Sequence, residues 1–155
     1  MLVLAACWYF KDAHWPENAD LGKVISLTHL VFPPSARLLH GNYIDSDCSC
    51  EEKYIRAKVA IRPTDVDSLV KQLRDGMYRI STTDRLGVSD GIRLKPLGEG
   101  VTTPRHTWRT PGWWRPGSAR KFLAALLQSG YSDTHVLVDL DDPKQAVVYV
   151  NYMEH

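Results

Sequence analysis

The segment 135–152, HVLVDLDDPKQAVVYVNY, constrains the fold more than any other part of the sequence. Valines and aromatic residues crowd both of its arms, and Asp142-Pro143-Lys144-Gln145 separates the arms, which is typical of two paired strands joined by a turn. In the first arm Val136, Val138 and Leu140 alternate with His135, Leu137, Asp139 and Asp141. The segment therefore predicts a β-hairpin with one core face and one mixed face.

Three further segments have the composition of strands. Residues 24–32 are apolar and end at Pro33-Pro34, where neither residue can donate to a β-ladder, so we expect a strand there. Residues 36–44 predict a second extended segment. Residues 54–62 are the cleanest alternating run in the first half of the chain, with Ile55, Ala57, Val59 and Ile61 on one side, which predicts a half-buried antiparallel strand.

Two segments have helical periodicity. After Pro63, Thr64 is a candidate N-cap with Asp67 three residues later, and Gly76 is a candidate C-terminal stop. The apolar residues between them, at positions 66, 69, 70 and 73, follow the i, i+3, i+4, i+7 pattern of one helix face. Residues 118–128 predict the second helix, with apolar residues at 122, 123, 126 and 127 and Gly130 after the end.

The order of these elements predicts an α+β fold, a single antiparallel sheet with two amphipathic helices packed on one face. We expect an N-terminal segment at residues 1–22 and one domain at residues 23–155. Its long irregular middle, residues 77–117, suggests only a short strand at 92–97, and such long connections are often functional.

Composition narrows the classes of partner. With 44% apolar residues, a chain of 155 residues can build the core of one domain. A formal net charge of +1 gives no general attraction to nucleic acid or anionic lipid, so such binding would require a local patch. No apolar run approaches the roughly 20 residues of a transmembrane helix.

The segment 105–121, RHTWRTPGWWRPGSARK, is the strongest candidate for a binding site. It holds five basic residues, three tryptophans and no acid, and it leads into the expected helix start at Ser118, where free backbone amides favour an anion. Guanidinium groups beside indole rings suit a protein partner, an anionic sugar or single-stranded nucleic acid. Alternatively, the indoles anchor the segment to the sheet while the arginines face solvent. The candidate ligand-binding residues are Arg105, Trp108, Arg109, Trp113, Trp114 and Arg115.

Catalysis and metal binding have weaker candidates. Depending on the register of the hairpin, its mixed face carries four polar residues, His135, Asp139, Tyr149 and Asn151. In that case His135 and Asp139 would be the acid–base pair of a hydrolase. A solvated sheet face has the same composition. Asp139, Asp141 and Asp142 would offer oxygen ligands to a hard cation, although acids beside a proline turn are common without one. The common hydrolase, zinc-protease and nucleotide-binding motifs are absent, and we expect no cofactor and no metal.

The three cysteines bear on the cellular location of the protein and on metal binding. Leu4-Ala5-Ala6-Cys7 has the form of a bacterial lipobox, in which the cysteine carries lipid, although Met1 lies only six residues before it. Either Cys7 ends a truncated signal or residues 2–10 form a buried first strand. Cys48 and Cys50 are closer in sequence than the cysteines of usual zinc sites. His29 and His40 could complete a zinc site, but we expect the cysteine pair to bind no metal.

The segment Phe32-Pro33-Pro34-Ser35-Ala36, the strand at 54–61 and the helix after Thr64 resemble those of small uncharacterised bacterial envelope proteins, often lipoproteins and often actinobacterial. The resemblance covers roughly residues 4–75. It implies an extracytoplasmic location and no particular activity.

Together these features suggest a non-enzymatic, envelope-associated domain that binds a protein or small ligand. The alternatives are a cytoplasmic binder of nucleic acid or another polyanion, which would use segment 105–121, and a hydrolase that would use His135 and Asp139.

Overall fold

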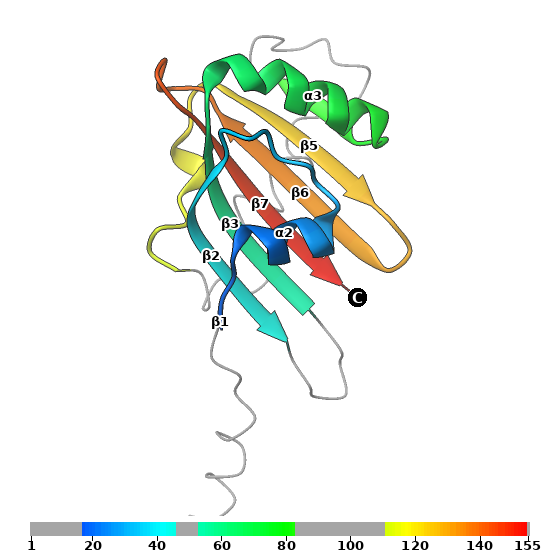
Figure 1. Cartoon of the computed structure of the whole chain (residues 1–155). Coiled ribbons are helices and arrows are strands. Elements are labelled where there is room, and N and C mark those ends of the chain that lie inside the picture. The colour runs from blue at the N-terminus through cyan, green and yellow to red at the C-terminus, as the bar shows by residue number, and fades with distance from the viewer. Residues whose placement is uncertain (1–16, 46–52, 83–110, 155) are drawn as a thin grey trace, which may run out of the picture.

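The computed structural model describes residues 17–45, 53–82 and 111–154. Within these ranges seven strands form one antiparallel sheet in the order β1-β2-β3-β7-β6-β5-β4 (Figure 1). The strands are β1 (Glu17–Asn18), β2 (Arg37–Asp45), β3 (Lys53–Ile61), β4 (Arg79–Thr82), β5 (Phe122–Gln128), β6 (Ser132–Asp139) and β7 (Ala146–Glu154). The helices are α2 (Leu21–Thr28) and α3 (Val66–Asp75), with short 3-10 turns at Pro63–Asp65 and Pro116–Ser118. The prediction of an α+β fold with an antiparallel sheet is therefore confirmed.

The C-terminal hairpin joins the two halves of the sheet. Strand β7 lies between β3 and β6, so Val150 is opposite Ala57 on one side and Val136 on the other. The predicted turn is present: the backbone N–H of Gln145 donates to the carbonyl of Asp142 at 3.4 Å. The hairpin prediction is confirmed. Its second strand, β7, takes part in the two most central strand pairings of the sheet.

Helix α2 begins one residue after Asp20, whose carboxylate accepts a hydrogen bond from the backbone N–H of Lys23 at 2.7 Å. It ends at His29, which takes a left-handed conformation with φ 55°. The prediction of a strand at residues 24–32 is therefore wrong. The inward-facing residues of this segment instead follow helical spacing: Leu21, Val24, Ile25 and Thr28. The buried Thr28 hydroxyl has a hydrogen-bond partner, because it donates to the Val24 carbonyl at 2.7 Å.

Helix α3 confirms the predicted helix after Pro63, with two differences at its ends. Thr64 belongs to the preceding 3-10 turn, and the N-cap residue is Asp65, whose side chain makes no capping hydrogen bond. Asp65 instead accepts hydrogen bonds from the Ser35 hydroxyl and from Arg62. Gly76 follows the helix as predicted, but the left-handed residue is Met77, with φ 63°. These side-chain contacts tie the start of α3 to the segment before β2.

The predicted helix at residues 118–128 is wrong, because residues Phe122–Gln128 form strand β5. Leucine and alanine are good helix formers, but propensity is a weak preference that tertiary pairing overrides. Here β5 lies between β6 and β4, and both of its faces are buried: Leu123 and Ala125 face one side of the sheet and Ala124 and Leu126 the other. Strand β4 lies in the middle that we expected to be irregular.

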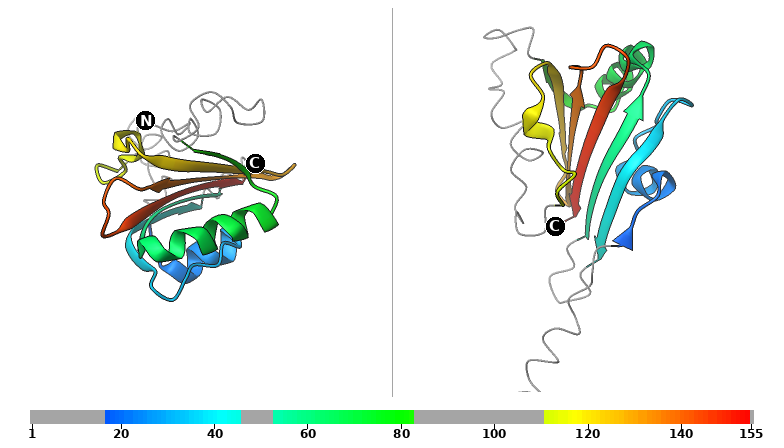
Figure 2. Two further views of the ribbon diagram at one scale, coloured as in Figure 1. Left: turned by 90° about the horizontal axis from the view of Figure 1, so that it is seen from above. Right: turned by 90° about the vertical axis from the view of Figure 1, so that its left-hand side faces the viewer.

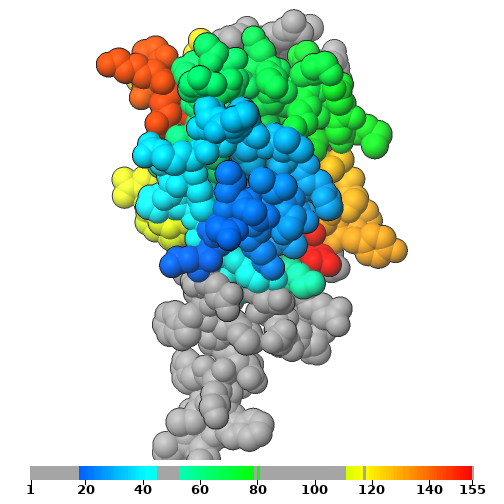
Figure 3. Space-filling view, viewed as in Figure 1, coloured from blue at the N-terminus to red at the C-terminus, as the bar shows by residue number. Residues whose placement is uncertain are grey.

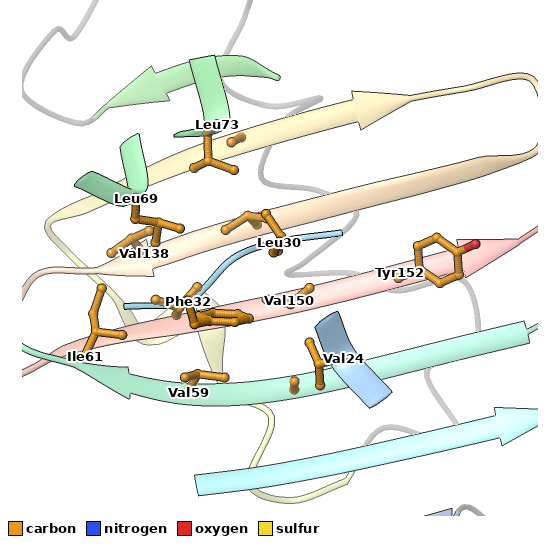
Figure 4. Packing of buried hydrophobic residues seen from close by; sticks show 14 of the residues in the cluster. Val24, Leu30, Phe32, Val59, Ile61, Leu69, Leu73, Val138, Val150 and Tyr152 are labelled. Atoms are coloured by element: carbon orange, nitrogen blue, oxygen red, sulfur yellow. The ribbon is translucent and has the colours of Figure 1, made fainter. Parts of the chain in front are cut away.

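The main core lies between the sheet and the two helices. Val24 of α2 and Leu69 and Leu73 of α3 belong to one buried cluster with inward residues of β3, β5, β6 and β7 (Figure 4). Both helices lie on the same side of the sheet in the two turned views (Figure 2), and together with the segment after α2 they cover it (Figure 3). We call this side the helix face. Among the described residues, neither helix is long and apolar enough to span a membrane.

Two close contacts fix the elements around this core. The Gln72 side chain of α3 donates to the Val31 carbonyl at 2.9 Å and accepts from the Val31 backbone N–H at 3.0 Å, as a paired strand would. At Gly41 of β2, an added Cβ would lie 2.3 Å from the carbonyl oxygen of Ala19. Glycine at this position therefore lets the chain before α2 approach the sheet edge.

Candidate functional site

Residues 111–121 lie against part of the opposite side of the sheet, across from the helices (Figure 2, right). We call it the tryptophan face. Side chains in register on neighbouring antiparallel strands share a face, so the pairings of β2, β3, β7 and β6 define rows across it. One row consists of His40, Lys58, Tyr149 and Leu137. The next row consists of Asn42, Arg56, Asn151 and His135, and we call it the polar row.

A β-bulge in β2 brings His40 to this face. The register of β2 against β3 shifts between Leu38, which is opposite Val59, and His40, which is opposite Lys58. Leu38 packs against the core of the helix face, whereas His40 is exposed on the other side. The extra residue in the bulge therefore reverses the side-chain alternation of β2 between these positions.

A chain of aromatic contacts attaches residues 111–121 to the sheet. The Trp113 indole stacks on the His40 imidazole, with ring centroids 5.0 Å apart and planes 14° apart. Trp113 meets Trp114 edge to face at 5.7 Å, and Trp114 meets Tyr149 in the same way at 5.4 Å. Trp114 is buried with Leu137 and Tyr149 in a second apolar cluster, while Trp113 remains half-buried. This arrangement matches the anchoring role that the sequence left open for the two indoles.

The polar row is unusual because it is buried. Arg56 is 4% exposed, Asn151 6% and His135 9%. Burial lowers the pKa of the Arg56 guanidinium, since desolvation disfavours the charged form. Asn42, at the β2 end of the row, is half-buried, and its Oδ1 is enclosed but accepts no hydrogen bond from the residues that the structure describes. The row becomes more accessible toward β2.

Positive charge gathers at this β2 side. Among the side chains that β2 and β3 direct to the tryptophan face, Arg37, His40, Arg56 and Lys58 are basic and none is acidic. The half-buried Lys58 ammonium lies 5.4 Å from the centroid of the Tyr149 ring. Within the described part of the chain, Lys58 pairs with no carboxylate. We call His40, Lys58, Asn42 and Arg56 the basic corner; they are two cross-strand pairs in neighbouring rows.

Only some of the predicted binding residues lie in the described part of the chain. Arg105, Trp108 and Arg109 lie outside the described residues. Arg115 is exposed, and its Nε donates to the Gly112 carbonyl at 3.0 Å.

The expected helix start at Ser118 is wrong, and with it the anion site at that helix end. The backbone N–H groups of Arg120 and Lys121 instead donate to the carboxylate of Asp141, at 2.9 and 2.7 Å. These hydrogen bonds lower the pKa of Asp141.

The hydrolase candidates share a face but do not meet. His135, Asp139, Tyr149 and Asn151 all project from the hairpin onto the tryptophan face, with Asn151 directly opposite His135. His135 and Asp139 are four residues apart on one strand, which is about 13 Å at roughly 3.3 Å per residue. Leu137 lies between them, and Asp139 accepts a hydrogen bond from the Asp141 N–H at 3.0 Å. A direct hydrogen bond between His135 and Asp139 is therefore not formed.

The acidic turn is occupied by backbone contacts. The Asp142 carboxylate accepts from the Lys144 N–H at 2.8 Å, so each of Asp139, Asp141 and Asp142 receives at least one backbone donor. In residues 17–45, 53–82 and 111–154 no three histidine, cysteine, aspartate or glutamate side chains group as a metal site. His29 ends a helix on the helix face and His40 lies on the other, so the sheet separates these two. Cys7, Cys48 and Cys50 lie outside the described residues.

The sequence contained part of the signal for the basic corner. The alternation in β3 already placed Tyr54, Arg56 and Lys58 on one side, opposite the core residues. We interpreted that side as solvated, whereas the structure buries Tyr54 and Arg56. Comparisons of this chain with protein-family models, with curated proteins and with solved structures find no match.

Proposed function

We propose that this chain is a non-enzymatic binding domain of the bacterial cell envelope, which takes a small ligand or a protein segment on its tryptophan face. The observation that carries the proposal is the difference between the two sides of the sheet. The helix face is filled with apolar side chains from both helices, as a structural core requires. The tryptophan face combines anchored indoles with buried and half-buried donors, a combination that costs stability and is typical of recognition sites.

Several features favour binding over catalysis. The acid–base candidates on this face are about 13 Å apart along β6. The polar groups instead form continuous rows of guanidinium, amide, ammonium and imidazole groups beside aromatic rings. Ligand sites commonly have this composition, in which a few polar groups fix the orientation of a ligand held by apolar and aromatic walls.

A binding screen on the full chain tests the proposal. The ¹⁵N-labelled protein is titrated with a chemically diverse set of small molecules and short peptides, and the indole Nε1–H signal of Trp113 is followed by NMR. We expect the compounds that bind to shift this signal and the amides of β2 and β3, and to leave α3 unshifted. In the variant Trp113→Ala, the same compounds should no longer shift the amides of β2 and β3. If bound compounds perturb α2 and α3 while the β2 and β3 amides stay unchanged, the binding face is misassigned.

Two observations weigh against nucleic acid as the ligand. One face of the Trp113 indole already carries the His40 ring, and Trp114 is buried, so these two tryptophans offer no series of open rings on which successive bases could stack. A single-stranded oligonucleotide in the same screen provides the comparison. Tight binding that weakens steeply with salt would favour a polyanion binder instead.

The envelope location follows from the lipobox-like start at Leu4-Ala5-Ala6-Cys7 and from the resemblance to envelope lipoproteins. Mass spectrometry of the natively expressed N-terminus tests it. We expect a diacylglycerol-modified Cys7 as the first residue, and expect Cys7→Ser to move the protein out of the membrane fraction. An unmodified N-terminus that begins at Met1 would contradict lipid anchoring and leave the binding proposal standing.

A further inference from the structure

We infer that the end of the sheet that carries Met77 and Tyr131 rests on the membrane surface to which the lipid on Cys7 anchors the chain. This inference rests on the envelope location in the proposed function and adds a second contact with the same bilayer. Three large apolar side chains in the described part of the chain are strongly exposed: Met77 at 83%, Tyr131 at 79% and Val31 at 63%. Met77 and Tyr131 lie at the same end of the sheet, and we call them the exposed pair.

Met77 occupies a backbone position that usually holds glycine. It follows α3 with φ 63°, and its N–H donates to the Arg74 carbonyl at 3.0 Å. The next N–H, of Tyr78, donates to the Leu73 carbonyl at 2.9 Å. These two hydrogen bonds form a Schellman motif, in which the left-handed residue is commonly glycine because a Cβ is disfavoured there. The methionine side chain is too exposed to repay this cost by packing within the chain, which points to a contact outside it.

Tyr131 lies in a turn whose backbone is held by its own hydrogen bonds. Between β5 and β6, the Ser129 hydroxyl oxygen accepts from the N–H groups of Tyr131, at 3.2 Å, and Ser132, at 2.9 Å. The Ser129 N–H donates to the Ser132 carbonyl at 2.8 Å. A fixed turn loses little entropy when its exposed side chain binds. A tyrosine ring with its hydroxyl suits the boundary between lipid and water.

The strand pairings place the exposed pair and the entry of the N-terminal chain at the same end of the sheet. One row of partners crosses the sheet from β1 to β5: Glu17, Tyr43, Ile55, Tyr152, Thr134 and Leu127. Tyr131 is in the turn just beyond this row. Met77 is two residues before Arg79, which pairs with Leu126 next to the row. In Figure 1 the end of α3 and the β5–β6 turn lie at the right-hand edge, and β1 and the end of β7 lie at the bottom.

The length of chain between Cys7 and β1 allows both contacts at once. Residues 8–16 separate Cys7 from Glu17, and nine residues span at most about 30 Å. From β1 to β5 the sheet has five strand spacings, which is about 24 Å. A lipid on Cys7 therefore reaches the bilayer that the exposed pair touches. Because the anchor keeps the domain at a high local concentration, a weak apolar contact is enough to orient it.

Charge does not supply this contact. Among the described side chains of the last rows, the one base, Lys53, pairs with Glu154 at 3.7 Å, and Asp133 adds a second acid. At the end of α3, Arg74 and Asp75 offset each other. An anionic surface therefore attracts this end no more than a zwitterionic one does. The contact depends on apolar side chains in the lipid interface.

Partition of the full chain into phosphatidylcholine vesicles, measured by flotation, tests the inference. With Cys7→Ser, which removes the lipid, we expect weak partition that is independent of salt and detectable below about 10 mM lipid. Adding Met77→Asn and Tyr131→Ser should reduce it by about tenfold or more, because both apolar side chains are lost. Asparagine tolerates the left-handed conformation, so the fold is kept. Val31→Ser is the matched control and should leave partition unchanged, since the neighbours of Val31, Leu30 and Phe32, pack in the helix-face core (Figure 4).

Orientation is measured on the lipidated full chain in phosphatidylcholine nanodiscs that contain spin-labelled lipid. We expect the amide signals of Met77 and Tyr131 to broaden. The amide of Lys144, in the β6–β7 turn at the opposite end of the sheet, should stay sharp. Broadening at Lys144 alone, no partition at 10 mM lipid, or equal partition with and without the exposed pair would overturn the inference. Self-association without vesicles that the double substitution removes would assign the pair to a second copy of the chain and overturn it too.

Two outcomes separate this inference from the proposed function. If Cys7 carries lipid but the amides of the exposed pair stay sharp, the envelope location stands and the inference is wrong. If Cys7 is unmodified but partition still depends on Met77 and Tyr131, the anchor is wrong and the membrane contact of the pair is supported. Neither outcome alters the expected shift of the Trp113 signal on ligand binding.

Discussion

Replacing Trp114 with alanine should destabilise the fold far more than the same change at Trp113, although the two tryptophans are adjacent. Trp114 is 5% exposed and packs between Tyr149 and Leu137, so its indole is the main apolar group that residues 111–121 place on the sheet. Trp113 is half-buried and contributes mainly its stacking on His40. The comparison therefore measures how much of the second apolar cluster depends on one side chain.

The size of the effect follows from the buried area. A tryptophan buries roughly 150–250 Å², which at about 25 cal/mol per Å² corresponds to about 4–6 kcal/mol. This is an upper limit, because the unfolded chain already shields part of the area. Allowing for that, Trp114→Ala should lower the free energy of unfolding by about 3–4 kcal/mol. For Trp113→Ala, about half the area is lost together with the ring contacts to His40 and Trp114, which corresponds to about 2 kcal/mol.

Urea unfolding followed by far-ultraviolet circular dichroism measures both losses without relying on tryptophan emission. The m-value should remain close to that of the parent chain, since the same surface is exposed on unfolding. Trp114→Phe is the conservative control, and it should recover about half of the lost free energy because a ring still fills the cluster. A loss below about 1 kcal/mol for Trp114→Ala, or a larger loss for Trp113→Ala, would refute the assignment of Trp114 as the anchor of this face.

Three other substitutions test contacts on and around the helix face. Gly41→Ala should cost about 1–3 kcal/mol, because its Cβ would collide with a backbone carbonyl of the chain before α2, whereas Gly130→Ala has open space and should be close to neutral; thermal melts compare the two. Gln72→Met removes both hydrogen bonds that join α3 to the segment after α2, and urea titration should show a loss of about 1–2 kcal/mol. Burial raises the pKa of the Tyr78 phenol, so the folded chain keeps a proton that the unfolded chain releases above about pH 10. Stability is therefore unaffected below that pH and falls as the pH rises through the folded-state pKa; Tyr78→Phe should reduce this fall, and Tyr131→Phe, at an exposed residue, should not.

The elements that the sequence predicted correctly have strong local periodicity. Strand β3 alternates from Tyr54 to Val59, the hairpin carries its own turn residues, and α3 follows a proline and presents an apolar stripe. In these segments the pattern also gave the correct core side: Ile55, Ala57, Val59 and Ile61 of β3 are all in the helix-face cluster. Local pattern and tertiary packing agree there, so no information from distant residues was needed.

Two of the errors concern short apolar segments in which periodicity and propensity gave the wrong secondary structure. The segment that forms α2 is rich in β-branched residues, which favour strands. Its inward-facing side includes the polar residue Thr28, which can be buried because its hydroxyl donates to the helix backbone. The segment that forms β5 consists of helix formers, but it completes the sheet between β4 and β6. Propensity differences of less than about 1 kcal/mol per residue cannot compete with pairing and burial on both faces.

The candidate site was harder to predict because it depends on contacts between distant residues. The sequence singled out residues 105–121 for their composition, and in the structure Trp113 and Trp114 pack against one part of the sheet face opposite the helices. Nothing in β3 or β7 alone indicates that Trp114, from a distant segment of the chain, packs against Tyr149 and Leu137, or that Arg56 is 4% exposed. The burial of Arg56 is therefore a property of the assembled sheet, even though its side was visible in the alternation of β3.

The bulge in β2 shows why the basic corner in particular could not be found from the sequence. In a regular strand, residues two apart share a face, so alternation places His40 and Asn42 on the same side as Leu38 and away from Arg56 and Lys58. The register shift between Leu38 and His40 reverses this assignment, so that both polar residues join the two cations. A bulge of this kind carries no obligatory residue at its extra position, whereas its effect on side-chain direction extends along the rest of the strand. The chemistry of the corner thus depends on one inserted residue in β2, and its donors come together only when the pairing with β3 is known.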